Sequence, residues 1–150
     1  MISIRPSRFD DIGVIAEFQL KLANETEGVN LNPRIVTTGI EALFADPGKG
    51  VYYVAESREK IIGCFLITYE WSDWRNGMIW WLQSVYVTES HRREGVFKRM
   101  YDYIHDAISK DSSLIGLRLY VDKSNARAQK VYQSLGMNGD HYMVFEWMKN

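Results

Sequence analysis

The sequence lacks several features that mark common protein classes. It has one cysteine, Cys64, so no disulfide can form within the chain. Its formal net charge is -1, whereas polyanion-binding domains usually carry a clear basic excess. It has no apolar run long enough to span a bilayer and no signal-peptide pattern at its start. We therefore expect a cytoplasmic protein that binds neither nucleic acid nor membrane.

The motifs of metal sites and of common catalytic centres are also missing. His91, His105 and His141 are scattered without ligand spacing, and there is no second cysteine to join them. No G-x-S-x-G, G-x-G-x-x-G or G-K-[ST] pattern is present. Residues 47–50 read PGKG, which is typical of a turn before a strand. We expect no bound metal and no covalent nucleophile.

The composition indicates a globular protein with a real core. Of 150 residues, 46% are hydrophobic and 25% are charged, and no repeat or linker interrupts them, so we predict one domain over residues 1–150. Strands are predicted over residues 2–7, 51–57, 61–71, 78–87, 114–121 and 141–148. Helices are predicted over residues 9–23, 33–45, 95–108 and 124–136. This interleaving indicates an α/β or α+β fold with a mixed sheet.

A glycine flanked by basic residues lies between the strand that ends at Val87 and the next helix. The amides of a helix's first turn carry partial positive charge and form a ready anion site. Gly95 lets the backbone approach a ligand closely, and Arg92, Arg93 and Lys98 add positive charge. The stretch is interpreted either as a pyrophosphate site or as an ordinary helix start with solvated arginines.

Two motifs in order resemble the GNAT superfamily of N-acetyltransferases. That family binds the pyrophosphate of acetyl-CoA with a Q/R-x-x-G-x-G/A loop, and residues 92–97 match it, with Phe97 in place of the last Gly or Ala. An Asn that opens a helix and a Tyr seven residues later match Asn125 and Tyr132. The resemblance is strongest over residues 78–137 and implies a mixed, mostly antiparallel sheet with splayed central strands, flanked by helices.

The resemblance also implies acetyl-CoA as co-substrate. The residues it assigns to acetyl-CoA are Val85, Tyr86, Val87, Arg92, Arg93, Glu94, Gly95, Val96, Phe97, Lys98 and Asn125. The first three would offer backbone groups to the pantetheine and the thioester, whereas the loop would hold the pyrophosphate. Residues 84–87 also suit an ordinary buried strand, and both interpretations hold together because the contacts are backbone ones.

Tyr132 matches the general acid of the family, which protonates the departing thiolate. A phenol with a reference pKa of about 10 suits a group that must be protonated at neutral pH. The alternative role is packing on the apolar face of its helix, beside Val131 and Leu135.

The base and the acceptor contacts are less defined. Gln83 stands where many members of the family carry Glu, so Glu70 or Asp73 is the alternative base or acceptor contact. A water relay or an already neutral amine would also serve, and both acids equally suit a solvated turn. Trp74 and Gln83 are candidate acceptor contacts, because tryptophans can form a wall for a cationic amine.

The predicted function is transfer of an acetyl group from acetyl-CoA to a primary amine of a small molecule or peptide, within a ternary complex. The alternative is a catalytically weak CoA-binding sensor or partner-binding domain, which Gln83 and Phe97 favour. The many aromatic residues fit a homodimer interface as well as an acceptor pocket.

Overall fold

The computed structural model describes residues 1–150 and divides the chain into two compact units, Met1–Arg118 and Leu119–Asn150. The first unit contains the sheet and three helices, and the second contains one helix followed by an irregular segment. The prediction of a single domain stays a prediction.

The first unit is built on a five-stranded sheet in the order β1-β2-β3-β4-β5. Its strands are β1 (Ile2–Pro6), β2 (Val51–Ser57), β3 (Lys60–Ser72), β4 (Gly77–Val87) and β5 (Leu114–Arg118). Its helices are α1 (Ile12–Glu27), α2 (Pro33–Ala45) and α3 (Val96–Lys110), with short 3-10 turns η1 (Phe9–Asp11) and η2 (Glu89–His91). Strands β1 to β4 pair antiparallel and β5 pairs parallel to β4. The expected mixed, mostly antiparallel sheet is confirmed.

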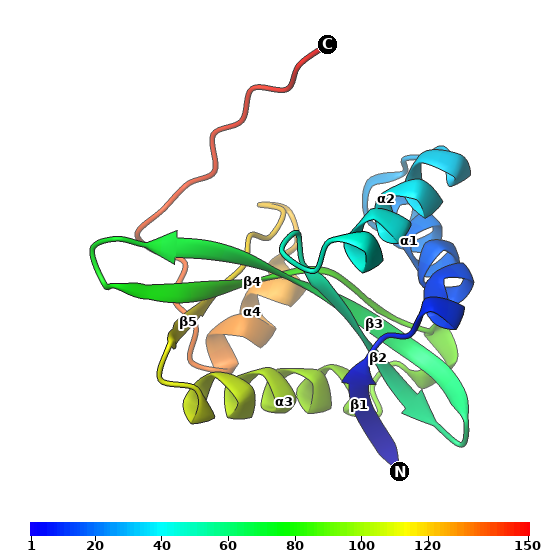
Figure 1. Cartoon of the computed structure of the whole chain (residues 1–150), viewed down its shortest axis with the longest axis horizontal. Coiled ribbons are helices and arrows are strands. Elements are labelled where there is room, and N and C mark those ends of the chain that lie inside the picture. The colour runs from blue at the N-terminus through cyan, green and yellow to red at the C-terminus, as the bar shows by residue number, and fades with distance from the viewer. The chain divides into compact units, whose positions relative to one another are not determined.

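Helices cover both faces of this sheet, with α1 and α2 on one face and α3 on the other (Figure 1). Because neighbouring side chains on a strand point to opposite faces, each strand serves both layers. Tyr52 and Cys64 belong to the core cluster that includes residues of α1 and α2. On the other face, Tyr53 stacks on Phe65 and lies against Tyr103 of α3.

Local signals set the ends of the helices. The side chain of Asn32 accepts hydrogen bonds from the Arg34 and Ile35 amides, and Pro33 takes the first helical position of α2. Helix α1 ends at Gly28, whose φ of 65° is the left-handed conformation that glycine adopts easily. None of the helices has the length and apolarity needed to cross a membrane.

The second unit contains α4 (Ala126–Ser134), which Asn125 caps by accepting a hydrogen bond from the Ala128 amide at 3.1 Å. Residues 137–150 form no helix or strand, so the predicted strand over residues 141–148 is wrong. Strand β5 also ends at Arg118, three residues short of its predicted end. The alternation of residues 114–121 and the apolar run within residues 141–148 both favour a strand, but a strand forms only where a neighbouring strand satisfies its backbone.

A buried carboxylate connects β1 to the start of α1. Asp11 is 7% exposed and accepts hydrogen bonds from Arg5 Nη1 at 2.8 Å and from the Arg8 amide at 2.7 Å. Burial alone raises the pKa of the Asp11 carboxyl, but these hydrogen bonds outweigh it and hold the pKa below its ordinary value.

Asp11→Asn is expected to lower the free energy of unfolding by about 2 kcal/mol at pH 7, the order of a hydrogen bond to a charged group. Because the folded pKa is depressed, the stabilisation is complete above the unfolded pKa of about 3.9 and is lost as the pH falls through the folded pKa. Urea unfolding of both proteins at several pH values would measure this. A difference that stays constant down to pH 2 would contradict the ion-pair account.

Candidate active site

Strand β4 is paired along only part of one edge. Its pairing with β5 runs from Met78 to Trp81, because β5 ends at Arg118, which lies beside Trp81. Residues 82–87 continue along β3 without a β5 partner. The second half of β4 therefore presents a row of backbone groups at an edge that no neighbouring strand of this sheet occupies.

Antiparallel alternation decides which of these backbone groups face the open edge. The Thr88 amide donates to the Ile62 carbonyl, so the next pair, Val87 with Gly63, is the non-hydrogen-bonded kind. The backbone of Val87 thus faces away from β3, and by the same alternation the backbone of Tyr86 faces β3. Of the three predicted backbone contacts, the alternation leaves Val87 at the open edge and turns Tyr86 away from it, whereas Val85 lies where the register slips.

A bulge bends β4 within this edge. The register with β3 slips between Cys64 and Leu66, and Ser84 adopts a φ of 54°. The Ser84 carbonyl accepts a hydrogen bond from Gln19 Nε2 of α1 at 3.5 Å, and the same nitrogen donates to Cys64 Sγ at 3.4 Å. Gln19 is only 8% exposed, so these hydrogen bonds are shielded from water and stabilise the bulge from the side of α1. Bulges of this kind aim a strand's groups toward a ligand.

The loop after β4 has the backbone of an anion cradle. Arg93 and Gly95 have φ values of 66° and 79°, and α3 begins at Val96. No atom lies within 4 Å of the place where a Cβ of Gly95 would stand, so the glycine is required by conformation and leaves the loop open. The first amides of α3 have no acceptor inside the helix and point toward this loop. The loop therefore fits a pyrophosphate.

Some basic side chains of the loop contact other groups of the protein, and others point into solvent. Arg92 donates from Nε to the Val87 carbonyl at 2.9 Å and from Nη2 to Glu25 of α1, which ties the end of β4 to α1. Lys98 pairs with Asp102 one turn along α3. Arg93 is exposed and stands in the loop itself. The structure thus makes Arg92 a positioning residue, whereas Arg93 is the arginine best placed to meet an anion.

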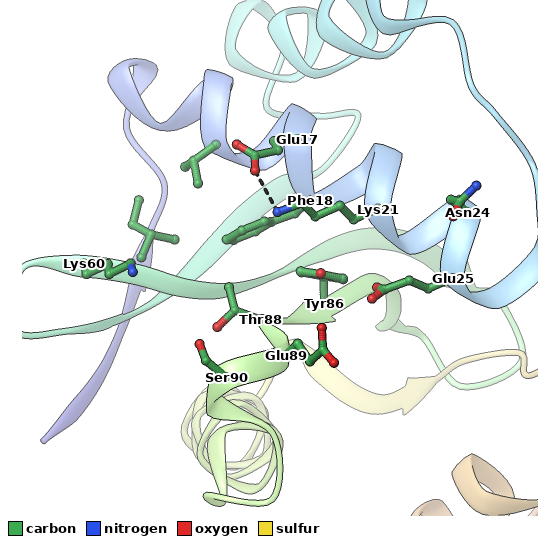
Figure 2. Close-up of a pocket in the computed structure, with 12 residues that line it drawn as sticks. Glu17, Phe18, Lys21, Asn24, Glu25, Lys60, Tyr86, Thr88, Glu89 and Ser90 are labelled. Atoms are coloured by element: carbon green, nitrogen blue, oxygen red, sulfur yellow. Dashed lines mark ion pairs between the residues drawn. The ribbon is translucent and has the colours of Figure 1, made fainter.

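An open cleft of about 760 Å³ lies between α1 and the end of β4 (Figure 2). Tyr86 lies in it against Phe18, with ring centroids 5.0 Å apart, and burial and then Glu25 raise the pKa of Tyr86. The rim of the cleft carries both positive and negative side chains, including the Glu17–Lys21 ion pair at 2.8 Å. Mixed charge favours no ion of one sign, so the cleft by itself indicates no ligand.

A polar network crosses three strands on the sheet. Trp81 Nε1 donates to Glu70 Oε1 at 2.8 Å, and Arg118 of β5 pairs with the other carboxylate oxygen of Glu70. These contacts, the Trp81 hydrogen bond first, lower the pKa of Glu70 below its ordinary value. Glu70 is therefore a firmly ionised group at neutral pH, which suits an acceptor contact better than a base.

The other predicted acceptor residues do not lie together. Gln83 donates to Thr68 Oγ1 at 2.6 Å in the middle of the sheet. Asp73 and Trp74 lie in the exposed β3–β4 turn, where the Asp73 carboxylate accepts from the Trp74 amide. Six residues of strand from Gly77 to Gln83 span roughly 20 Å at 3.3 Å each. The structure does not bring the turn to the bulge.

The second unit holds the remaining predicted residues. Tyr132 is half-buried on α4, and burial raises the pKa of its phenol. The Tyr132 carbonyl accepts from the Met137 amide at 3.0 Å, which closes the helix end. Asn125 uses its side-chain oxygen as the helix cap. Both residues thus have local structural roles beside the roles that the motif implies.

Sequence reasoning missed the partners that lie far apart in the chain. Gln19 beneath the bulge and Arg118 beside Glu70 were not singled out, because 65 and 48 residues separate them from the groups they contact. Glu25 and Arg92 are 67 residues apart. No local spacing signals such pairs, which come together only through the packing of α1 on the sheet and the order of the strands.

Comparison with known proteins agrees with this geometry. A sequence model of the acetyltransferase (GNAT) family matches residues 18–137. A possible acetyltransferase from Clostridium difficile 630 is 43% identical, with a TM-score of 0.94 over 100% of this chain and 99% of that one. No curated protein matches the chain.

Two more distant structures share the fold. A predicted acetyltransferase from Clostridium acetobutylicum, solved with acetyl-CoA, is 19% identical, with a TM-score of 0.75 over 97% of this chain and 96% of that one. A ribosomal-protein-alanine N-acetyltransferase from Brucella melitensis biovar Abortus 2308 is 15% identical, with a TM-score of 0.79 over 99% and 100%. The chain belongs to the GNAT acetyltransferase family.

Proposed function

We propose that the protein transfers an acetyl group from acetyl-CoA to a primary amine of a small molecule or peptide, by direct attack in a ternary complex. One observation carries the proposal: the open edge of β4 leads, through the short turn η2, to a loop at the start of α3 in which Arg93 and Gly95 have left-handed φ values. This arrangement offers an anion site and a row of hydrogen-bond donors on one continuous stretch of chain.

The two ends of acetyl-CoA would bind to different parts of that stretch, one to the loop and the other to the strand edge. The pyrophosphate would bind the amides of residues 93–98, where the helix start supplies partial positive charge. The pantetheine and the thioester would lie along the open edge of β4. An amide of Val85 or Val87 would then donate to the carbonyl oxygen as negative charge builds on it during attack.

The chemistry needs one bond to form and one to break. The amine nitrogen attacks the carbonyl carbon, the C–N bond forms, and the C–S bond breaks with its electrons left on sulfur. The Tyr132 phenol gives its proton to the thiolate, and its raised pKa keeps it protonated at neutral pH. The proton of the amine leaves to water, because Gln83 is no base.

Glu70 would bind a distal cationic group of the acceptor rather than remove the proton of the attacking amine, because its register partner Ile79 lies six residues, roughly 20 Å, from Val85. Its carboxylate is ionised and lies beside the Trp81 ring system, a pairing that suits an ammonium group. We expect Glu70→Gln to raise the KM of a cationic amine about tenfold, equivalent to about 1.4 kcal/mol. The rise of kcat/KM with pH toward the pKa of the amine, near 10.4, should keep its shape.

Steady-state kinetics of both proteins between pH 6 and 10 would measure these effects, with Asp73→Asn as the matched carboxylate control. A loss of kcat of a hundredfold with a flattened pH profile would instead make Glu70 the base.

Thermal unfolding with and without acetyl-CoA tests the cofactor side of the proposal. A ligand that binds only the folded state adds about 2.7 kcal/mol of stability at one hundred times its Kd. A raised midpoint with acetyl-CoA, larger than that with free adenosine, supports the loop as the pyrophosphate site. An unchanged midpoint at millimolar acetyl-CoA would favour the alternative, a partner-binding domain, which Phe97 in the loop motif suggests.

A further inference from the structure

The bulge of β4 contains a residue in a strained backbone conformation. In the register between the strands, Ser84 and Val85 of β4 lie opposite the single residue Phe65 of β3. Ser84 has a φ of 54°, which lies in the left-handed region that is unfavourable for residues other than glycine. Such a conformation persists only where the surrounding structure holds it, and it is often found at functional sites. The contacts that hold Ser84 are therefore candidates for a functional role.

Three buried polar side chains from three different elements gather at Ser84. They are Gln19 of α1, Tyr52 of β2 and Cys64 of β3, which are 8%, 5% and 0% exposed. The Ser84 carbonyl accepts hydrogen bonds from Gln19 Nε2 at 3.5 Å and from Cys64 Sγ at 3.9 Å. Burial and the nearby Cys64 raise the pKa of Tyr52, whereas a hydrogen bond with the Ser84 side chain lowers it. Buried polar networks of this kind specify one conformation of the groups they contact.

Helix α1 is anchored against β4 at this point, which gives Gln19 a defined position. Its neighbour Phe18 is 3% exposed and packs on the Tyr86 ring, with the centroids 5.0 Å apart (Figure 2). A glutamine amide nitrogen carries two N–H donors, and Gln19 uses them on Cys64 Sγ and on the Ser84 carbonyl. Because both donors are engaged and the helix is anchored, Gln19 sets the direction of the Ser84 carbonyl.

The direction of the Ser84 carbonyl determines the direction of the next amide. The peptide between residues 84 and 85 is planar and trans, so its C=O and N–H groups point in opposite directions. The carbonyl points toward α1 and Cys64 of β3. The Val85 amide therefore points away from both, toward the edge of β4 that β5 leaves open.

We propose that Gln19 is a positioning residue for acetyl transfer: by holding the Ser84 carbonyl, it aims the Val85 amide at the carbonyl oxygen of the thioester. This inference rests on the proposed function. Gln19 acts through the backbone between residues 84 and 85, and we assign it no contact with acetyl-CoA or with the acceptor. An amide held in this direction before the reaction stabilises the developing negative charge without reorganising.

Gln19→Met removes both N–H donors and keeps the length of the side chain. We expect kcat to fall about a hundredfold, because a misplacement of about 1 Å at a reacting group costs that much. The Kd for acetyl-CoA should stay within twofold of wild type, since the loop at the start of α3 is unchanged. Amine-dependent release of CoA thiol and calorimetry would measure the two quantities. A merely structural glutamine would lower the unfolding midpoint and leave kcat intact.

Asp11→Asn is the matched control for a loss of buried hydrogen bonds near α1. Asp11 lies eight residues before Gln19, about 12 Å along a helix at 1.5 Å per residue, and its partners are Arg5 and Arg8. This variant should lower the unfolding midpoint and keep kcat within twofold of wild type. A fall of kcat in Asp11→Asn as large as that in Gln19→Met would assign both losses to destabilisation and overturn the proposal.

A rescue experiment tests whether Gln19 acts through Ser84. Glycine adopts a φ of 54° without strain, so Ser84→Gly removes the need for outside support of that conformation. In the Ser84→Gly background, Gln19→Met should lower kcat by about tenfold or less, because residues that act through one another are not additive. An equal loss in both backgrounds would show that Gln19 does not act through Ser84, and would overturn the proposal.

Infrared spectroscopy of bound acetyl-CoA, isotopically labelled at the thioester carbonyl, tests the positioning without any acceptor. A hydrogen bond from the Val85 amide lowers the stretching frequency of that carbonyl, and we expect a smaller shift in Gln19→Met. A shift that depends on Gln19 in a protein without turnover would contradict the proposed function and leave the aimed amide standing. Normal turnover with an unchanged shift in Gln19→Met would overturn the proposal and leave the proposed function standing. A wild type whose carbonyl band does not move on binding also overturns it.

Discussion

Tyr132→Phe is expected to lower kcat about 100- to 10,000-fold, the range of general acid catalysis, and to leave the Kd for acetyl-CoA unchanged. The substitution removes one oxygen and keeps the ring, so the packing of α4 survives. What is lost is the proton that the departing thiolate needs. A merely structural tyrosine on this helix would instead affect the free energy of unfolding and leave kcat nearly intact.

The pH dependence of the wild type follows from the same group. Burial raises the pKa of Tyr132 above its ordinary value of about 10, so the phenol remains protonated from pH 6 to 9. Its contribution to kcat should be lost only as the pH rises through that raised pKa. Stopped-flow thiol release and calorimetric acetyl-CoA binding would measure kcat and Kd separately. Tyr69→Phe, a half-exposed tyrosine on β3, is the control, and a kcat for Tyr132→Phe within twofold of wild type would exclude the acid role.

Gly95→Ala is expected to raise the Kd for acetyl-CoA by roughly 10- to 150-fold. The new Cβ would meet no atom within 4 Å, so the effect comes from the backbone: Gly95 has a φ of 79°, where other residues are strained by about 1–2 kcal/mol. Relaxing that strain turns the first amides of α3 away from the pyrophosphate. One lost hydrogen bond to a charged group costs about 1.5–3 kcal/mol, which gives the stated change in Kd.

Gly28→Ala is the matched control for this loop. Gly28 also has a left-handed φ, 65°, and also has open space where its Cβ would stand, but it ends α1 outside the loop. Both variants should lose about 1–2 kcal/mol of unfolding free energy. Only Gly95→Ala should weaken acetyl-CoA binding. Equal Kd values for the two variants would show that the loop does not hold the pyrophosphate.

The helices and most strands could be predicted from the sequence because their signals are local. Pro33 and Asn32 mark the start of α2, and the alternation within residues 51–57 gives β2. The strand predicted over residues 141–148 failed for a different reason. Its pattern is that of a strand, yet a strand also requires a partner, and periodicity carries no information about where that partner lies.

The candidate site divides in the same way. The loop and Gly95 could be found because a helix start after a strand is visible in the sequence, and the family resemblance is confirmed. The bulge at Ser84 and the support from Gln19 could not be found, because a slip of register between two strands leaves no local mark. Likewise, Glu70 could be named but its pairing with Arg118 could not, so its low pKa and its unsuitability as a base emerged only from the fold.

The most direct measurement of the central claim is the release of CoA thiol from acetyl-CoA in the presence of a panel of primary amines, with the acetylated product weighed by mass spectrometry. The account predicts thiol release that requires the amine, one N-acetyl product for each thiol, and a loss of both in Tyr132→Phe. Acetyl-CoA binding without any amine-dependent thiol release across polyamines, amino acids, aminoglycosides and peptides would contradict it and make the protein a CoA-binding domain of the same fold.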